Sequence, residues 1–103
     1  MYVRVVVFQD QTKMSKVIIT FKIMPESLDV DLKKLEVDVK RLINKYGEVG
    51  KVEVEEIAFG LKALKFIVIY DESKGDTEFL EDNIRNIDVV NSVDVVDVRR
   101  AIG

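Results

Sequence analysis

The chain passes twice through the same order of apolar patterns, and this repeat limits the folds that are open to it. Apolar residues alternate in some segments, as in a strand with one buried face, and recur every three or four residues in others, as in an amphipathic helix. The segments follow one another as strand (16–24), helix (32–46), strand (51–57), strand (61–70), helix (77–87) and strand (89–99).

Two strand–helix–strand halves joined by short links predict an α+β fold of the ferredoxin-like βαββαβ type. In this sandwich a four-stranded antiparallel sheet is covered on one face by two helices. Its first and third strands are central, and the corresponding segments, 16–24 and 61–70, are the most apolar of the four. The last strand changes its apolar face between Val95 and Val96, which predicts a β-bulge there.

Polar residues and one glycine indicate where the helices begin and end. Asp29 or Asp31 is expected to cap the first helix, and Gly47 is expected to stop it. Asp76 or Thr77 is expected to open the second helix.

Composition removes several classes of function. The 103 residues contain no cysteine and no histidine, so the chain has no thiolate nucleophile, no disulfide and no imidazole for acid–base catalysis or metal binding. The net charge of −3 disfavours non-specific binding to nucleic acid. No apolar run approaches the roughly 20 residues that a membrane span needs, and the first residues make a poor signal peptide. A cytoplasmic protein is therefore expected, without a cofactor or a bound metal, and composition disfavours an ordinary enzyme without excluding one.

Residues 1–13 lie outside the repeat. Tyr2 to Phe8 is expected either to add an edge strand or to precede a native start at Met14, as the product of an upstream start codon or a tag. We therefore divide the chain into an N-terminal extension, 1–13, and one domain, 14–103.

Phe59 and Gly60 lie between two predicted strands, where a hairpin turn is expected. Gly60 would supply a positive φ at the turn. Phe59 has two interpretations: it folds back on the core, or it is exposed at the tip as an anchor for a hydrophobic pocket on a partner.

Arg99 and Arg100 end the last predicted strand. They are either ordinary solvated charges that discourage pairing at a sheet edge, or guanidinium groups that reach carboxylates or phosphates or compete with a metal cation for its ligands.

Two further groups of residues are candidates for a site. The acidic residues Glu53, Glu55 and Glu56 do not have the spacing of a calcium loop, and alternation places Glu53 and Glu55 on a solvent face. Phe21 on the first strand, with Phe66 and Tyr70 on the third, would be the aromatic residues of an RNA-binding sheet, but the glycine-rich aromatic pattern of such modules is missing.

Residues 14 to about 102 resemble archaeal translation elongation factor 1-beta, the guanine-nucleotide exchange factor for elongation factor 1-alpha. Several motifs carry the resemblance in the same order and spacing. They are Val17 to Met24 followed by Pro25-Glu26-Ser27, Asp29-Val30-Asp31-Leu32, Glu56 to Leu64, Gly75-Asp76-Thr77-Glu78, and Val95 to Arg100.

The resemblance implies a ferredoxin-like fold and an activity that depends on binding. It implies that the partner is elongation factor 1-alpha in its GDP-bound and nucleotide-free states, with no direct contact to nucleic acid or membrane. By position, Arg100, with Arg99 beside it, is the basic residue that helps to displace Mg²⁺ from the G-protein. Phe59 is the aromatic that docks on its second domain, and Gly60 lets the loop turn. Eukaryotic relatives have a lysine where this chain has the arginine pair. The alternative is a small ferredoxin-like regulatory or ligand-binding module without exchange activity.

Overall fold

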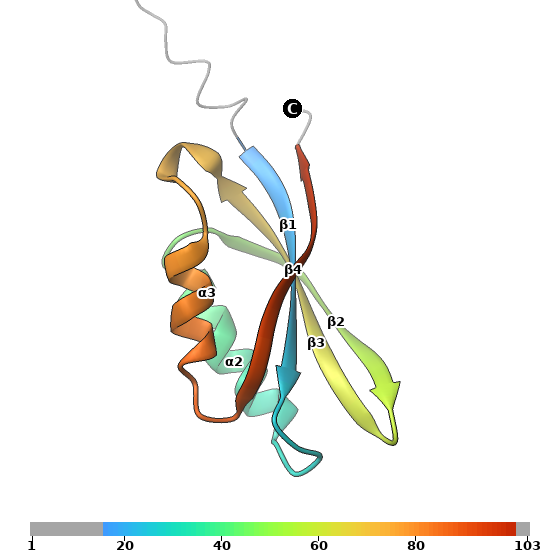
Figure 1. Cartoon of the computed structure of the whole chain (residues 1–103). Helices are drawn as coiled ribbons and strands as arrows, with labels where there is room; N and C mark the ends of the chain where they lie inside the picture. The colour runs from blue at the N-terminus through green and yellow to red at the C-terminus, as the bar shows by residue number, and fades with distance from the viewer. Residues whose placement is uncertain (1–15, 101–103) are drawn as a thin grey trace, which may run out of the picture.

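The structure, a computed structural model, describes residues 16–100, and the predicted extension at 1–13 lies outside them. Figure 1 shows one twisted sheet with both helices on the same face. The elements are β1 (Lys16–Pro25), α2 (Leu32–Ile43), β2 (Glu48–Ala58), β3 (Leu61–Asp71), a 3₁₀ turn η1 (Glu72–Lys74), α3 (Glu78–Arg85) and β4 (Val90–Arg100). The predicted α+β ferredoxin-like sandwich is confirmed.

The sheet is antiparallel with the strand order β2-β3-β1-β4, so that β1 and β3 are central as predicted. In their pairing Phe21 lies opposite Phe66, and Val17 lies opposite Tyr70. These four side chains thus share the face that the helices cover. We call this the helix-side face, and the other the open face.

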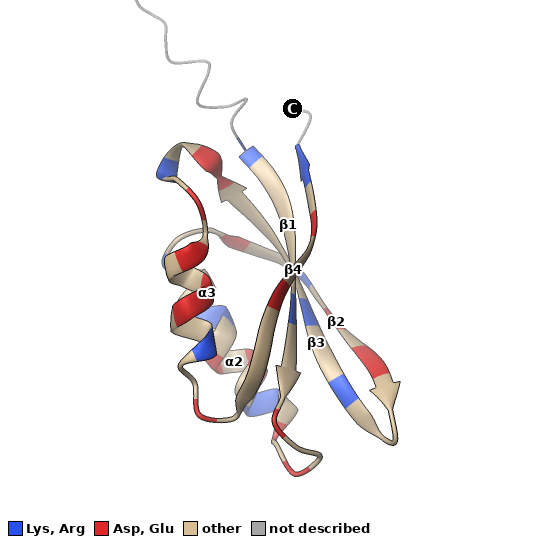
Figure 2. Cartoon of the chain, in the orientation of Figure 1, with Lys and Arg blue, Asp and Glu red and all other residues tan. Residues whose placement is uncertain are grey.

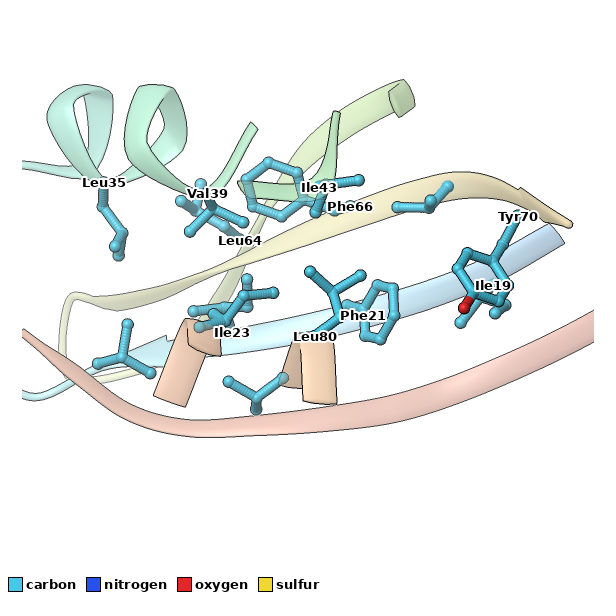
Figure 3. Close-up of a cluster of buried hydrophobic side chains, with 14 of the residues drawn as sticks. Ile19, Phe21, Ile23, Leu35, Val39, Ile43, Leu64, Phe66, Tyr70 and Leu80 are labelled. Carbon is cyan, nitrogen blue, oxygen red and sulfur yellow. The ribbon is translucent and has the colours of Figure 1, made fainter. Parts of the chain in front are cut away.

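The core fills the space between the helix-side face and the two helices (Figure 3). Each helix contributes residues at spacings of three or four to this layer. The side chains that are 1% exposed or less and belong to this cluster are Phe21, Ile23, Leu35, Val39, Ile43, Leu64, Phe66, Val68, Tyr70, Leu80 and Ile84.

Asp31, rather than Asp29, caps α2: its Oδ1 accepts hydrogen bonds from the backbone N–H groups of Lys33 at 3.1 Å and Lys34 at 3.3 Å. These donors would otherwise lack a partner in the first helical turn.

Thr77 is the N-cap of α3, yet its hydroxyl donates to Glu81 Oε2 at 2.7 Å. Asp76 supplies the acceptor for the helix, because its Oδ1 accepts from the backbone N–H of Glu78 at 3.1 Å. Both predicted residues therefore contribute to the start of α3: Thr77 occupies the N-cap position, and Asp76 accepts the hydrogen bond from the backbone.

Gly47 was wrongly predicted as the stop signal of the first helix. The helix ends at Ile43 with Asn44 as C-cap, and Gly47 is not among the described glycines with positive φ. Its role is to allow close packing, because a Cβ there would lie only 2.9 Å from the backbone oxygen of Ile69. This requirement comes from the neighbouring strand β3.

The predicted bulge in the last strand is confirmed. Phe21 pairs with Val95 and Thr20 pairs with Asp97, which leaves Val96 as the extra residue of β4. The bulge changes which side chains face the helices in the rest of β4.

We expect Phe21→Ala to lower the free energy of unfolding by about 3–5 kcal/mol, because it removes a fully buried ring from the centre of the core. Urea denaturation followed by circular dichroism measures this change. Val98→Ala is the control: Val98 is 59% exposed, and its substitution should change the value by less than about 0.5 kcal/mol. Equal losses in both variants would contradict this assignment of the core.

Candidate functional site

Phe59 and Gly60 form the two-residue turn that joins β2 and β3. Ala58 pairs with Leu61 on either side of it, and φ is 53° at Phe59 and 84° at Gly60. Positive φ at both central residues defines a type I′ turn, whose twist matches that of the strands. The positive φ predicted for Gly60 is confirmed. Figure 1 shows the β2–β3 hairpin projecting away from the helices, so its tip lies beyond the core.

Phe59 is 98% exposed, and the interpretation that it folds back on the core is wrong. The first central position of a type I′ turn favours asparagine, aspartate or glycine. A left-handed backbone is unfavourable for phenylalanine, and burial of the ring does not offset this cost. A residue that is unfavourable for folding in both respects is a candidate for binding another molecule.

Arg99 and Arg100 both belong to β4, where they pair with Ile18 and Val17 of β1. The predicted strand thus extends one residue further, to Arg100. Cross-strand partners share a face, and Val17 is buried on the helix side, so Arg100 lies on the helix-side face and Arg99 on the open face.

Each guanidinium is exposed but already bound to a carboxylate. Nε of Arg99 donates to Asp97 Oδ2 at 2.9 Å. Nη1 of Arg100 donates to Glu72 Oε1 at 2.7 Å, and its side chain is 71% exposed. Exposed pairs of this kind contribute about 0–1 kcal/mol, so a competing anion can take over either arginine at small cost.

The sequence did not indicate Glu72 as the partner of Arg100. Glu72 begins η1, directly after β3, whereas Arg100 ends β4. No sequence pattern links them, because they meet only through the pairing of β1 with both β3 and β4.

The structure does not bring Phe59 and the arginine pair together. Arg100 lies beside Val17, which pairs with Tyr70 near the far end of β3, whereas Phe59 precedes the first residue of β3. Nine residues of strand separate the two positions, a distance of about 30 Å at the usual rise per residue. Figure 2 shows the uncharged hairpin tip and the basic end of β4 at opposite ends of the sheet. Two separate contacts are available, rather than one pocket.

The aromatic residues considered for RNA binding are buried. Phe21, Phe66 and Tyr70 are each 1% exposed or less and lie on the helix-side face. They cannot stack on bases without unfolding the core, so the aromatic basis for an RNA-binding sheet is absent from these positions.

Two acidic side chains of β2, those of Glu53 and Glu55, are paired with lysines. Lys51 lies 3.0 Å from Glu53, and its hydrogen bond and positive charge hold the pKa of the Glu53 carboxyl below its usual value. Lys22 lies 3.5 Å from Glu55. Within residues 16–100 no three acidic side chains are grouped so that they could hold a metal ion. None of the described helices is long and apolar enough to cross a membrane.

A hollow of about 530 Å³ lies between the loops that precede α2 and β4. Leu35 and Ile87 line it, together with Glu26, Asp31 and Asp88, which are exposed. Because these lining residues are exposed, the hollow is an open depression of the surface. None of its residues that the structure describes indicates a particular ligand.

These features are typical of a small ferredoxin-like binding domain. Its exposed side chains lie at the two ends of the sheet, where another molecule can contact them. A family model for the EF-1 guanine nucleotide exchange domain matches residues 18–101. The chain belongs to the EF-1 guanine nucleotide exchange domain family, and the resemblance seen in the sequence is confirmed.

Curated relatives agree with this assignment. The chain is 41% identical over 87 residues to elongation factor 1-beta of Methanothermobacter thermautotrophicus, covering 84% of this chain and 98% of that protein. It is 42% identical over 87 residues to elongation factor 1-beta of Halobacterium salinarum, covering 84% and 99%. The same identity holds over 80 residues with elongation factor 1-beta of Nanoarchaeum equitans, covering 78% and 99%.

We expect Phe59→Asn to raise the free energy of unfolding by about 1 kcal/mol, because asparagine tolerates the left-handed backbone and no buried contact is lost. Phe59→Ala lacks the short polar side chain that makes this conformation tolerable for asparagine, and it should leave stability unchanged. Urea denaturation distinguishes them, and destabilisation by Phe59→Asn would show that the ring supports the fold.

Proposed function

We propose that this protein promotes the exchange of GDP for GTP on elongation factor 1-alpha. The observation that carries the proposal is Phe59, a fully exposed ring in a strained turn, in a chain of the EF-1 guanine nucleotide exchange domain family. On this proposal the protein works in the cytoplasm by binding alone, without covalent chemistry, a cofactor, or direct contact with nucleic acid or membrane.

In the proposed complex Phe59 anchors the hairpin tip in an apolar pocket on the G-protein. Burying an exposed ring contributes strongly to affinity, since aromatic anchors in fully desolvated pockets dominate most interfaces. The turn fixes the backbone beneath the ring, so little conformational freedom is lost on binding. Gly60 supports this presentation through its own positive φ.

At the other end of the sheet Arg100, with Arg99 beside it, would approach the magnesium and phosphate region of the G-protein. Mg²⁺ neutralises part of the phosphate charge, so disturbing its site loosens GDP. A guanidinium carries the charge and donor geometry to compete there. Arg100 would leave Glu72 and bind groups of the partner instead. Because the Arg100–Glu72 ion pair is exposed, breaking it costs little free energy.

The spacing of about 30 Å between the two ends suits a partner of more than one domain. The hairpin would fix the orientation on one domain while the arginines act on the nucleotide-binding domain. Exchange also requires the factor to bind the nucleotide-free G-protein more tightly than the GDP-bound form, because only a difference in affinity shifts the equilibrium.

The direct test is release of a fluorescent GDP analogue from archaeal elongation factor 1-alpha in the presence of excess unlabelled GDP. Catalytic amounts of this protein should accelerate release. Absence of acceleration at micromolar concentration, where the wild-type protein is folded, would overturn the proposed function.

The two ends should contribute differently to exchange. Arg100→Ala should lower the maximal rate of GDP release more than it lowers affinity, because it removes the group that acts at the nucleotide site. Arg85→Ala is the matched control: Arg85 also donates to a carboxylate at 2.7 Å, on Asp82, but lies on α3. Equal effects of the two substitutions would contradict a specific role for Arg100.

Phe59→Ala should weaken the complex by roughly 2 kcal/mol, or about thirtyfold in Kd, with the maximal rate retained at saturation. Titration of the exchange rate against protein concentration gives both quantities. Normal affinity in this variant would refute the role of the hairpin anchor while leaving the exchange function itself intact.

A further inference from the structure

Leu28 is a second exposed apolar side chain at the hairpin end of the molecule. It belongs to the loop between β1 and α2 and is 63% exposed. Its Cδ2 lies 3.8 Å from the place that a Cβ on Gly60 would occupy, so it lies beside the turn that presents Phe59. Figure 1 shows the β1–α2 loop at the same end of the sheet as the tip of the β2–β3 hairpin.

A hollow of about 190 Å³ lies between this loop and the hairpin. Pro25, Leu28 and Leu61 give it apolar walls, Gly60 leaves one side open by lacking a side chain, and Lys62 carries a positive charge beside it. The hollow therefore borders the turn that presents Phe59, and one cationic side chain is among its lining residues.

The fold does not explain why position 28 is a leucine. Val30 and Leu32, which follow in the same loop and at the start of α2, pack against the core, whereas Leu28 leaves most of its surface in water. Phe59 and Ile57 add exposed apolar surface at the same end, and the run from Ile57 to Leu61 carries no charge. Exposed apolar side chains that form one contiguous patch mark an interaction site.

We propose that Leu28 and Phe59 form one continuous docking surface for the G-protein partner. This inference rests on the proposed function. The Phe59 ring enters the partner, and the hollow beside Leu28 receives an apolar side chain of the partner from the opposite direction. Lys62 is placed to meet a carboxylate of the partner at the edge. Such mutual insertion excludes water around Phe59, the condition under which an aromatic anchor contributes most to affinity.

Leu28→Ala tests the surface without disturbing the core. We expect Kd for elongation factor 1-alpha to rise roughly fivefold to tenfold, with the thermal unfolding midpoint and the maximal rate of GDP release unchanged. Val37→Ala is the matched control, because Val37 is an aliphatic residue of α2 that is 52% exposed and does not line the hollow. Its Kd should equal that of the wild-type protein.

The double variant Leu28→Ala/Phe59→Ala tests continuity. Residues that share one interface site are energetically coupled, so the combined loss of affinity should differ from the product of the single losses by about threefold or more. A combined loss equal to that product would show two separate contacts and overturn the single surface.

The controls separate this inference from the proposed function. If the wild-type protein accelerates GDP release and Phe59→Ala weakens binding, but Leu28→Ala binds normally, the inference is wrong and the function stands. Equal weakening by Leu28→Ala and Val37→Ala also overturns it, since the effect would not be specific to the hairpin end. If the wild-type protein itself neither binds nor accelerates release, both proposals fail together.

Discussion

The packing of two helices against the helix-side face of β1 and β3 is the interaction on which the rest of the structure depends. Phe21 and Phe66 lie opposite each other at its centre, and both are completely buried. Because this layer satisfies the apolar requirement of the fold, the two ends of the sheet carry little of its stability. Residues there are not required for core packing, and the fully exposed Phe59 is an example.

The length of the strands gives this small domain its reach. β3 spans Leu61–Asp71, and its pairing with β1 ends at Leu64, so the residues before Leu64 extend the hairpin beyond β1 and away from the helices. The bulge at Val96 changes the faces of β4, which places Arg100 on the helix-side face, next to η1 and Glu72. Local backbone geometry at two positions, a type I′ turn and a bulge, thus decides where the candidate contacts point.

For an exchange factor this separation has a physical advantage. Affinity supplied at the hairpin end need not depend on the nucleotide, so the anchored state can persist while GDP leaves and GTP enters. In the proposed mechanism the arginine end makes contacts whose strength differs between the GDP-bound and nucleotide-free partner. Because Arg99 and Arg100 are held by Asp97 and Glu72 at exposed positions, their contacts can change readily.

The sequence by itself determined the element order, the central strands, the bulge at Val96 and the positive φ of Gly60, because these follow from periodicity and from the steric limits of single residues. Its motifs also carried the resemblance to the family. The tertiary structure decided whether Phe59 is buried or exposed, that Gly47 is required by the backbone of Ile69, and that Glu72 holds Arg100. It also placed Leu28 beside Gly60. Each of these depends on segments distant in the chain that meet only when the sheet forms, and no local pattern records such contacts.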